Sequence, residues 1–219
     1  MKERIFKIIC NVAVTCISAK KLRKLQYWVF RSREVLKEAG SMNNALIVYY
    51  SLTGNTEKVA HAIQKGLEKA GRHVTVKKID DAENEDLYMY DLVCFGTPVI
   101  HSLPANPVLE FIKKNDKRYR DAREVPLSPP ELLNKNALVF CTYSGPHCGI
   151  DEALPAGKYL VQFLKHLGFS IKGEWYEIGE FHEWPDGSIK GRLGDIRGRP
   201  NDEDLALIEL KTIQLARSL

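Results

Sequence analysis

One short run of residues, Ser51-Leu52-Thr53-Gly54-Asn55-Thr56, carries the clearest chemical potential in the sequence. Its three hydroxyl side chains and single glycine lie between an apolar segment and an amphipathic one, a junction that suits a phosphate group. Gly54 allows a tight turn, backbone amides point inward, and the N-terminus of the following helix adds partial positive charge. The alternative is that Ser51 and Thr53 merely cap that helix. The sequence lacks the patterns Gly-x-x-x-x-Gly-Lys and Gly-x-Gly-x-x-Gly, typical of nucleoside triphosphate hydrolysis and of built-in dinucleotide binding.

Alternating strand and helix patterns surround this run from residue 45 onward. Short apolar or β-branched runs predict five strands, at residues 45–50, 73–79, 91–96, 137–142 and 169–178. Helical spacing predicts helices at about residues 56–71, after Pro107, at about 151–167 and at 202–219, the last capped by Asn201 or Asp202. This order indicates an α/β fold, a doubly wound parallel sheet covered on both faces. Such sheets bind ligands at the carboxyl ends of their strands, here after Tyr50, Phe95 and Thr142.

Two long segments interrupt the alternation, residues 114–135 and 179–200. The first is polar and contains three prolines, and the second is rich in glycine and in charged residues. Loops of this length inside a compact domain are usually functional or insertional. We therefore expect one or both to contribute to a site.

The run at residues 51–56 resembles the phosphate-binding loop of flavodoxins, whose pattern is Ser or Thr, any residue, Thr, Gly, any residue and Thr. Residues 91–99 are similar to the second flavin-contacting loop of that family, and residues 137–149 to the strand and loop that close over the other side of the ring. The similarity covers about residues 44–218. It implies a flavodoxin-like doubly wound five-stranded parallel sheet of order 2-1-3-4-5 and noncovalently bound FMN.

The resemblance also implies which residues contact this cofactor. The FMN phosphate would be held by Ser51, Thr53, Asn55 and Thr56, together with the backbone amides of Leu52 and Gly54. One side of the isoalloxazine ring would be approached by Thr97, Pro98 and Val99. The other side would be approached by Thr142, Tyr143, Ser144 and Gly145, with their amides bonding the pyrimidine edge.

Three features depart from flavodoxins that act as electron carriers, which are usually acidic around the flavin and often enclose the ring between aromatic residues. The second loop continues as Ile100-His101-Ser102 without an aromatic residue, and the third carries His147 and Cys148. A later loop carries His182 beside Phe181 and Trp184, and residues 1–43 have no counterpart in the minimal fold. These departures favour a pocket for a small substrate.

Two histidines are candidate catalytic residues, His101 and His147, because both lie on loops that should border the flavin. The roles of His182 and Cys148 stay open, since the course of the loop around His182 is unknown and a cysteine with no visible low-pKa environment is more often an ordinary residue than a redox thiol. Five other residues are expected to be structural: His61, His73, His166, Cys94 and Cys141.

Charge divides the chain into two parts. Residues 1–40 contain 10 Lys and Arg against 3 Asp and Glu, a net charge of +7, whereas the remaining residues contain 22 against 25, a net charge of −3. We expect a basic amphipathic helical extension over residues 1–43 and a flavodoxin-like FMN-binding domain over residues 44–219. The extension is interpreted as a helix packed on the domain or on a partner, as a membrane-surface helix, or as a processed or disordered leader. The mildly acidic body gives no argument for nucleic-acid binding.

The preferred functional interpretation is an FMN-dependent oxidoreductase that passes electrons from NAD(P)H or a reduced partner to a quinone or a similar small acceptor. One alternative is a noncatalytic flavodoxin-type electron carrier between partner proteins, and another is a domain that has lost the cofactor and serves as an interaction module. Five cysteines without metal-ligand spacing argue against a disulfide scaffold and a metal site, and favour the cytoplasm. Residues 1–40 suggest peripheral contact with an anionic membrane surface or an acidic partner. The oligomeric state is not predicted.

Overall fold

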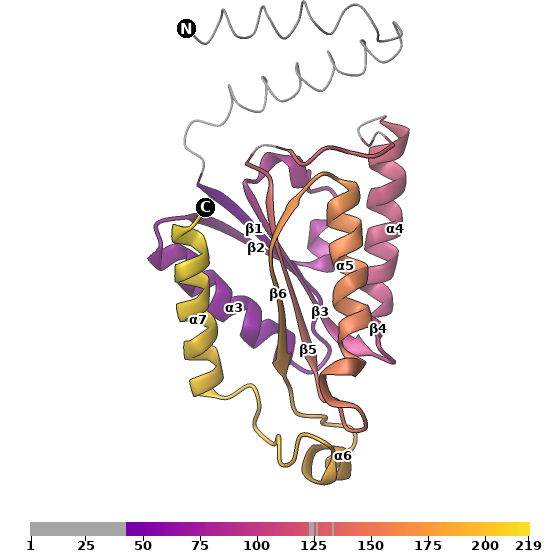
Figure 1. The fold of residues 1–219 in the computed structure, drawn as a ribbon, viewed down its shortest axis with the longest axis vertical. Coiled ribbons are helices and arrows are strands. Elements are labelled where there is room, and N and C mark those ends of the chain that lie inside the picture. Colours follow the sequence, from indigo (N-terminus) through magenta and orange to yellow (C-terminus); the bar gives the residue numbers. More distant parts are fainter. Residues whose placement is uncertain (1–42, 123–124, 126, 133) are drawn as a thin grey trace, which may run out of the picture. The chain divides into compact units, whose positions relative to one another are not determined.

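The computed structural model describes residues 43–122, 125, 127–132 and 134–219 (Figure 1). The expected helical extension over residues 1–43 lies almost entirely outside the described residues, so its structure and its boundary with the domain stay predictions. Asn43–Leu219 form one compact unit, which contains every element named below.

Five parallel strands form the sheet, in the order β2-β1-β3-β5-β6. Their bounds are Asn44–Tyr49 (β1), His73–Lys78 (β2), Leu92–Ile100 (β3), Asn136–Tyr143 (β5) and Ser170–Ile178 (β6). A short strand β4 (Leu103–Pro104) pairs antiparallel with the end of β3. Counted along the chain, the parallel strands have the order 2-1-3-4-5, so the predicted flavodoxin-like topology is confirmed. The direction of winding reverses between β1 and β3, which makes their carboxyl ends the expected ligand site.

Helices cover both faces of this sheet (Figure 1). One face is covered by α3 (Asn55–Lys69) and α7 (Asp202–Arg217), and the other by α4 (Asn106–Asp121) and α5 (Leu154–His166). Shorter elements are α6 (Pro185–Lys190) and three 3-10 turns, Ile79–Ala82, Leu87–Met89 and Gly149–Glu152. The four predicted helices are therefore confirmed, and Asn201 caps α7 by accepting a hydrogen bond from the Asp204 amide.

The alternation of side chains along the central strands divides the core into two layers. In β1, Leu46 and Val48 pack with residues of α4 and α5, whereas Ile47 and Tyr49 pack with residues of α3 and α7. All four are at most 2% exposed. Because each buried apolar side chain of this size contributes about 1.5–3 kcal/mol, the sheet is a rigid base for the loops at its carboxyl edge.

The structure corrects three expected boundaries. Helix α4 continues to Asp121, so the predicted loop at residues 114–135 begins too early. Its last turns are held because the buried Tyr119 hydroxyl accepts a hydrogen bond from the Leu87 amide at 2.9 Å. Strand β3 extends beyond Gly96 to Ile100 because it pairs there with β4. Helix α6 lies within residues 179–200, which were predicted to be a loop.

None of the described helices is both long and apolar enough to span a membrane.

Candidate functional site

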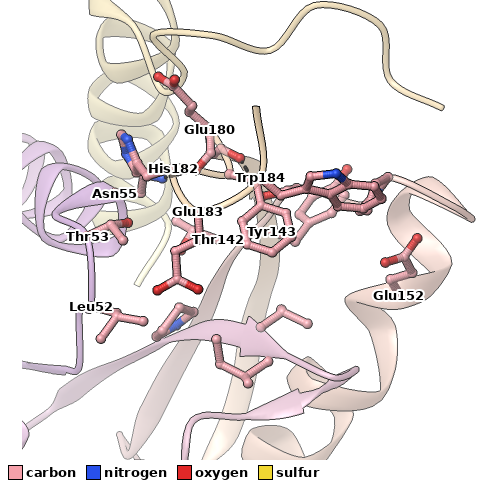
Figure 2. Close-up of a pocket in the computed structure, with 18 of the residues that line it drawn as sticks. Leu52, Thr53, Asn55, Thr142, Tyr143, Glu152, Glu180, His182, Glu183 and Trp184 are labelled. Atoms are coloured by element: carbon pink, nitrogen blue, oxygen red, sulfur yellow. Dashed lines mark hydrogen bonds between the residues drawn. The ribbon is translucent and has the colours of Figure 1, made fainter. Parts of the chain in front are cut away.

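A cavity of about 430 Å³ opens at the carboxyl ends of β1, β3 and β5 (Figure 2). The predicted residues that line it are Leu52, Thr53, Asn55, Thr56, Pro98, Val99, His101, Thr142, Tyr143, Ser144, Gly145 and His147. The others that line it are Ile100, Ser102, Pro146, Glu152, Gly179, Glu180, Phe181, His182, Glu183 and Trp184. The structure thus brings all three predicted segments to one cavity, together with a fourth segment after β6. Ser51, Gly54 and Thr97 are not among the lining residues.

The loop between β1 and α3 has the backbone geometry of an anion site. Gly54 has φ +94°, a left-handed conformation that favours glycine, and a Cβ placed there would meet no heavy atom within 4 Å. The first amides of α3 have no intrahelical acceptors, and the helix N-terminus attracts negative charge. Ser51 does act partly as a cap, because its Oγ accepts hydrogen bonds from the amides of Gly54 (3.1 Å) and Glu57 (3.2 Å).

The one carboxylate in the first turn of α3 is neutralised by its neighbours. Glu57 forms an ion pair with Lys78 at 2.9 Å and accepts a hydrogen bond from the Tyr49 hydroxyl at 2.8 Å. These two contacts, Lys78 first, hold the pKa of Glu57 below its usual value. The negative charge next to the loop is therefore already paired, which favours an anion at the helix N-terminus.

Two polar side chains of the loop are tied to other elements. The Thr56 and Thr142 hydroxyl oxygens lie 2.7 Å apart, with the two residues only 1% and 4% exposed, and this bond joins α3 to the end of β5. The Asn55 Nδ2 atom donates to the Glu180 carbonyl at 3.0 Å, which joins α3 to the loop after β6. Thr53 remains exposed and lines the cavity.

The second predicted segment forms one wall through Pro98 and Val99. His101 and Ser102 form the two-residue turn between β3 and β4, with φ of +50° and +62°. Such a turn needs positive φ at both positions, which is uncommon for residues other than glycine. Thr97 has a structural contact instead, since its Oγ1 donates to the Pro98 carbonyl at 2.9 Å and accepts from the Ala105 amide at 3.1 Å.

The third predicted segment forms the opposite wall. Tyr143 is 8% exposed, and burial raises the pKa of its hydroxyl. The Ser144 hydroxyl donates to the Gly179 carbonyl at 2.9 Å. Beyond Gly145 the loop is held by Glu152, whose Oε1 accepts hydrogen bonds from the amides of His147 (2.8 Å) and Cys148 (2.5 Å).

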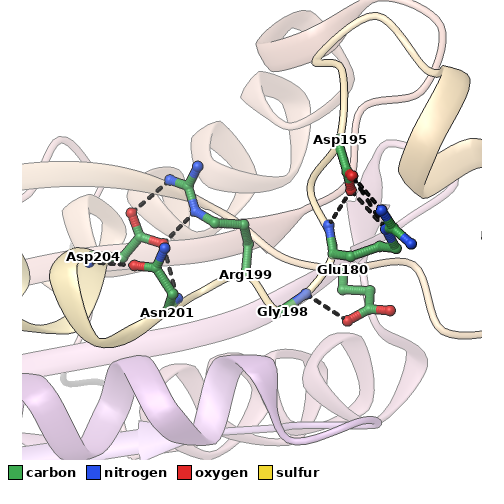
Figure 3. Close-up of polar contacts among 7 residues, drawn as sticks. Glu180, Asp195, Gly198, Arg199, Asn201 and Asp204 are labelled. Carbon is green, nitrogen blue, oxygen red and sulfur yellow. Dashed lines mark hydrogen bonds and ion pairs between the residues drawn. The ribbon is translucent and has the colours of Figure 1, made fainter.

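The segment after β6 supplies a part of the cavity wall that was not predicted from the sequence. Residues 179–184 bring an aromatic pair, Phe181 and Trp184, whose ring centroids lie 6.0 Å apart. A polar network links this segment to α7 (Figure 3). The Glu180 carboxylate accepts a hydrogen bond from the Gly198 amide at 2.8 Å, and Arg199 forms an ion pair with Asp204 of α7. The signal for this wall was present in the sequence as the aromatic and histidine residues that follow the fifth predicted strand.

Histidines and carboxylates both surround the cavity. The histidines are His101, His147 and His182, and the carboxylates are Glu152, Glu180 and Glu183. The prediction that histidines replace the acidic residues around the flavin is therefore incomplete. Glu152, in the turn before α5, and Glu180 and Glu183, in the segment after β6, also line the cavity. Cys148 is exposed but does not line the cavity, and Cys94 and Cys141 are buried core residues as predicted. In the described part of the chain, no cluster of three His, Cys, Asp or Glu residues is arranged to hold a metal ion.

Comparison with known proteins gives the family. A family model described as flavodoxin matches residues 47–191. The chain belongs to the flavodoxin family. An NAD(P)H dehydrogenase (quinone) of Archaeoglobus fulgidus is 25% identical over 170 residues, which cover 64% of this chain and 84% of that protein. A flavodoxin of Clostridium beijerinckii is 35% identical over 71 residues, covering 30% of this chain and 51% of that protein. The structure of oxidised flavodoxin 2 from Bacillus cereus matches with a TM-score of 0.57 at 18% identity, covering 80% of this chain and 99% of that chain.

Membership in the flavodoxin family implies FMN as the cofactor, and the described residues fit this group. The helix N-terminus, the open space at Gly54 and the exposed Thr53 hydroxyl suit a phosphate dianion. At the other end of the cavity, Val99 and the buried Tyr143 offer apolar walls for a planar ring. Figure 2 shows this division, with Leu52, Thr53 and Asn55 at one side and Tyr143 and Trp184 at the other.

Proposed function

We propose that this protein is an FMN-dependent oxidoreductase that passes electrons from NAD(P)H to a quinone or a similar small acceptor. The observation that carries the proposal is the cavity itself, which joins a helix N-terminus that suits an anion to a mouth lined by Phe181 and Trp184. The names of the curated relatives, NAD(P)H dehydrogenase (quinone), support the same activity.

Most of the predicted site residues have a proposed role in holding FMN. The amides of Leu52, Thr53, Asn55 and Thr56 and the Thr53 hydroxyl bind the phosphate, with Ser51 and Gly54 shaping the loop around it. Val99 and Tyr143 enclose the ring, and the amides of residues 142–145 bond its polar edge. When bound, FMN supplies the redox chemistry, which oxidises NAD(P)H to NAD(P)⁺ and, with one added proton, reduces a quinone to a quinol.

The residues at the mouth adjust the charge around this reaction. His101 and His147, when protonated, stabilise negative charge that accumulates in the cavity, and Glu152 and Glu183 oppose it. We assign both histidines to charge stabilisation beside the cofactor.

Steady-state turnover tests the proposal. The purified full chain, supplied with FMN, should oxidise NADH or NADPH only when a soluble quinone is added, at a rate proportional to protein concentration. A chain that binds FMN but reduces no soluble acceptor, and exchanges electrons only with a reductase protein, would instead be an electron carrier. The matching segment of the Clostridium flavodoxin supports that second candidate. A preparation that binds no FMN would contradict both and leave an interaction module.

We also propose a cytoplasmic location, with residues 1–40 contacting an anionic membrane surface or an acidic partner. Their net charge of +7 supports this contact. The segment lies outside the described residues, so charge and spacing alone carry this part of the proposal.

A further inference from the structure

The mouth of the cavity carries an exposed aromatic cluster, formed by His147, Phe181 and Trp184, of which only His147 has a proposed role beside FMN. Trp184 lines the cavity yet remains 42% exposed. The centroid of its indole lies 5.8 Å from that of the His147 imidazole and 6.0 Å from that of the Phe181 ring, which it meets edge to face. A large apolar side chain that stays exposed to water does not gain the stabilising free energy that its burial would give. An ordered aromatic surface at a cavity mouth therefore indicates contact with a ligand.

The backbone around Trp184 fixes the position of its ring. Ser188, 1% exposed, accepts a hydrogen bond from the Phe181 amide at 2.8 Å through its Oγ, and the Trp184 amide donates to the Phe181 carbonyl at 3.3 Å. Gly187 lies beneath the indole, since a Cβ there would be 2.6 Å from the ring atom Cε3 of Trp184. The absence of a side chain at residue 187 lets the ring lie across the start of α6.

The His147 side of the cluster is fixed by a separate set of contacts. The His147 amide donates to Glu152, as described above, and the Arg192 amide donates to the Pro146 carbonyl at 2.8 Å. This last bond joins the loop after β5 to the segment after β6. Because both halves are held in place before any ligand arrives, binding costs little conformational entropy.

We infer that the aromatic cluster binds the electron acceptor and selects acceptors with a flat, conjugated, neutral ring. The inference rests on the proposed function. Tyr143, 8% exposed, lines the interior of the cavity, whereas Trp184 is open to solvent at the mouth, where an acceptor arrives. Aromatic rings attract one another in offset or edge-to-face arrangements. The carboxylates of Glu152 and Glu183 line the same cavity and disfavour anionic acceptors, so a neutral quinone fits best.

Equilibrium binding of duroquinone tests this inference, because a fully substituted quinone cannot add to the exposed Cys148. By isothermal titration in the presence of excess FMN, Trp184→Leu should weaken duroquinone binding about tenfold, and Trp184→Phe should restore most of the affinity. The KM for duroquinone should rise by the same factor. The Kd for FMN and the reduction of ferricyanide, which has no aromatic ring, should not change.

Two further variants sharpen the result. Gly187→Ala keeps the indole but displaces it, and should weaken duroquinone binding in the same direction. Tyr159→Leu removes an aromatic residue of similar exposure, 37%, from α5 outside the cavity, and should change nothing. Unchanged duroquinone affinity in Trp184→Leu, no binding to the original protein, or a loss of FMN affinity instead would overturn the inference. Quinone binding that depends on Trp184 without NAD(P)H-driven turnover would refute the proposed function and leave the inference standing.

Discussion

Replacing Thr53 with valine should weaken FMN binding at least tenfold and leave riboflavin binding nearly unchanged. Thr53 is exposed and lines the cavity directly before Gly54, so its hydroxyl is available to a phosphate oxygen. Thr56 differs, because its hydroxyl is buried and already lies 2.7 Å from that of Thr142. Valine keeps the shape of the threonine side chain and removes only the hydroxyl, which makes Thr53→Val the cleaner perturbation.

The magnitude follows from the charge of the ligand. A hydrogen bond to a charged group contributes about 1.5–3 kcal/mol. Since about 1.4 kcal/mol corresponds to a tenfold change in affinity, the loss of one such bond weakens binding by a factor of roughly 10 to 150. The exposure of Thr53 places the expected value toward the lower end, because water screens the interaction.

Quenching of flavin fluorescence on titration with FMN-free protein measures both dissociation constants. Riboflavin lacks the phosphate, so the ratio of the two constants isolates the contribution of the loop. Ser102→Ala, which removes a hydroxyl from the β3–β4 turn on the other wall, should change both constants by the same factor. Equal losses for FMN and riboflavin in Thr53→Val would refute the assignment of residues 51–56 to the phosphate.

Four other substitutions or deletions test separate parts of the account. Thr56→Val should lower the free energy of unfolding by about 1–3 kcal/mol, because it leaves the buried Thr142 hydroxyl unpaired. Adding Thr142→Val should lower it little further. Additive losses of the two substitutions in urea denaturation would contradict the pairing. Burial raises the pKa of Glu177 in the folded protein. Protonation of Glu177 therefore stabilises the fold at low pH, and this contribution is lost as the pH rises through the folded pKa. The unfolding free energy of Glu177→Gln minus that of the original protein should consequently increase from pH 4 to pH 7. His147→Gln should lower the two-electron potential of bound FMN by up to about 30 mV, and an unchanged potential would remove His147 from the mechanism. Deleting residues 1–40 should leave FMN binding intact and abolish salt-sensitive association with anionic vesicles; an insoluble product would show that the segment is a packing element.

The strands and their order could be predicted because each strand is a short apolar run and each helix an amphipathic one. Buried strands such as residues 45–50 have no other stable place than the centre of a sheet covered on both faces. The β3–β4 turn escaped prediction because His101 and Ser102 adopt positive φ without the Asn-Gly pattern that normally signals such a turn. Helix α6 escaped because its six residues include Gly187 and are held by tertiary contacts of Ser188 rather than by helical propensity.

The residues of the candidate site could be predicted where the position of the backbone decides whether a residue lines the cavity. They could be predicted less well where the direction of the side chain decides it. Residues 52–56 follow a strand directly and open a helix, so their place at the cavity is fixed by the fold. Thr97 lies in a predicted segment, but its hydroxyl bonds the Ala105 amide and does not line the cavity. Glu152 and Trp184 reach the cavity through loops whose course depends on many weak contacts, and no local pattern encodes that course.

A crystal structure of the full chain with FMN tests the central claim, that this one cavity holds the cofactor, most directly. We predict the phosphate within hydrogen-bond distance of the amides of Leu52, Thr53, Asn55 and Thr56 and of the Thr53 hydroxyl, with the ring between Val99 and Tyr143. A phosphate bound away from the N-terminus of α3, or a ring outside the walls formed by β3 and β5, would contradict it.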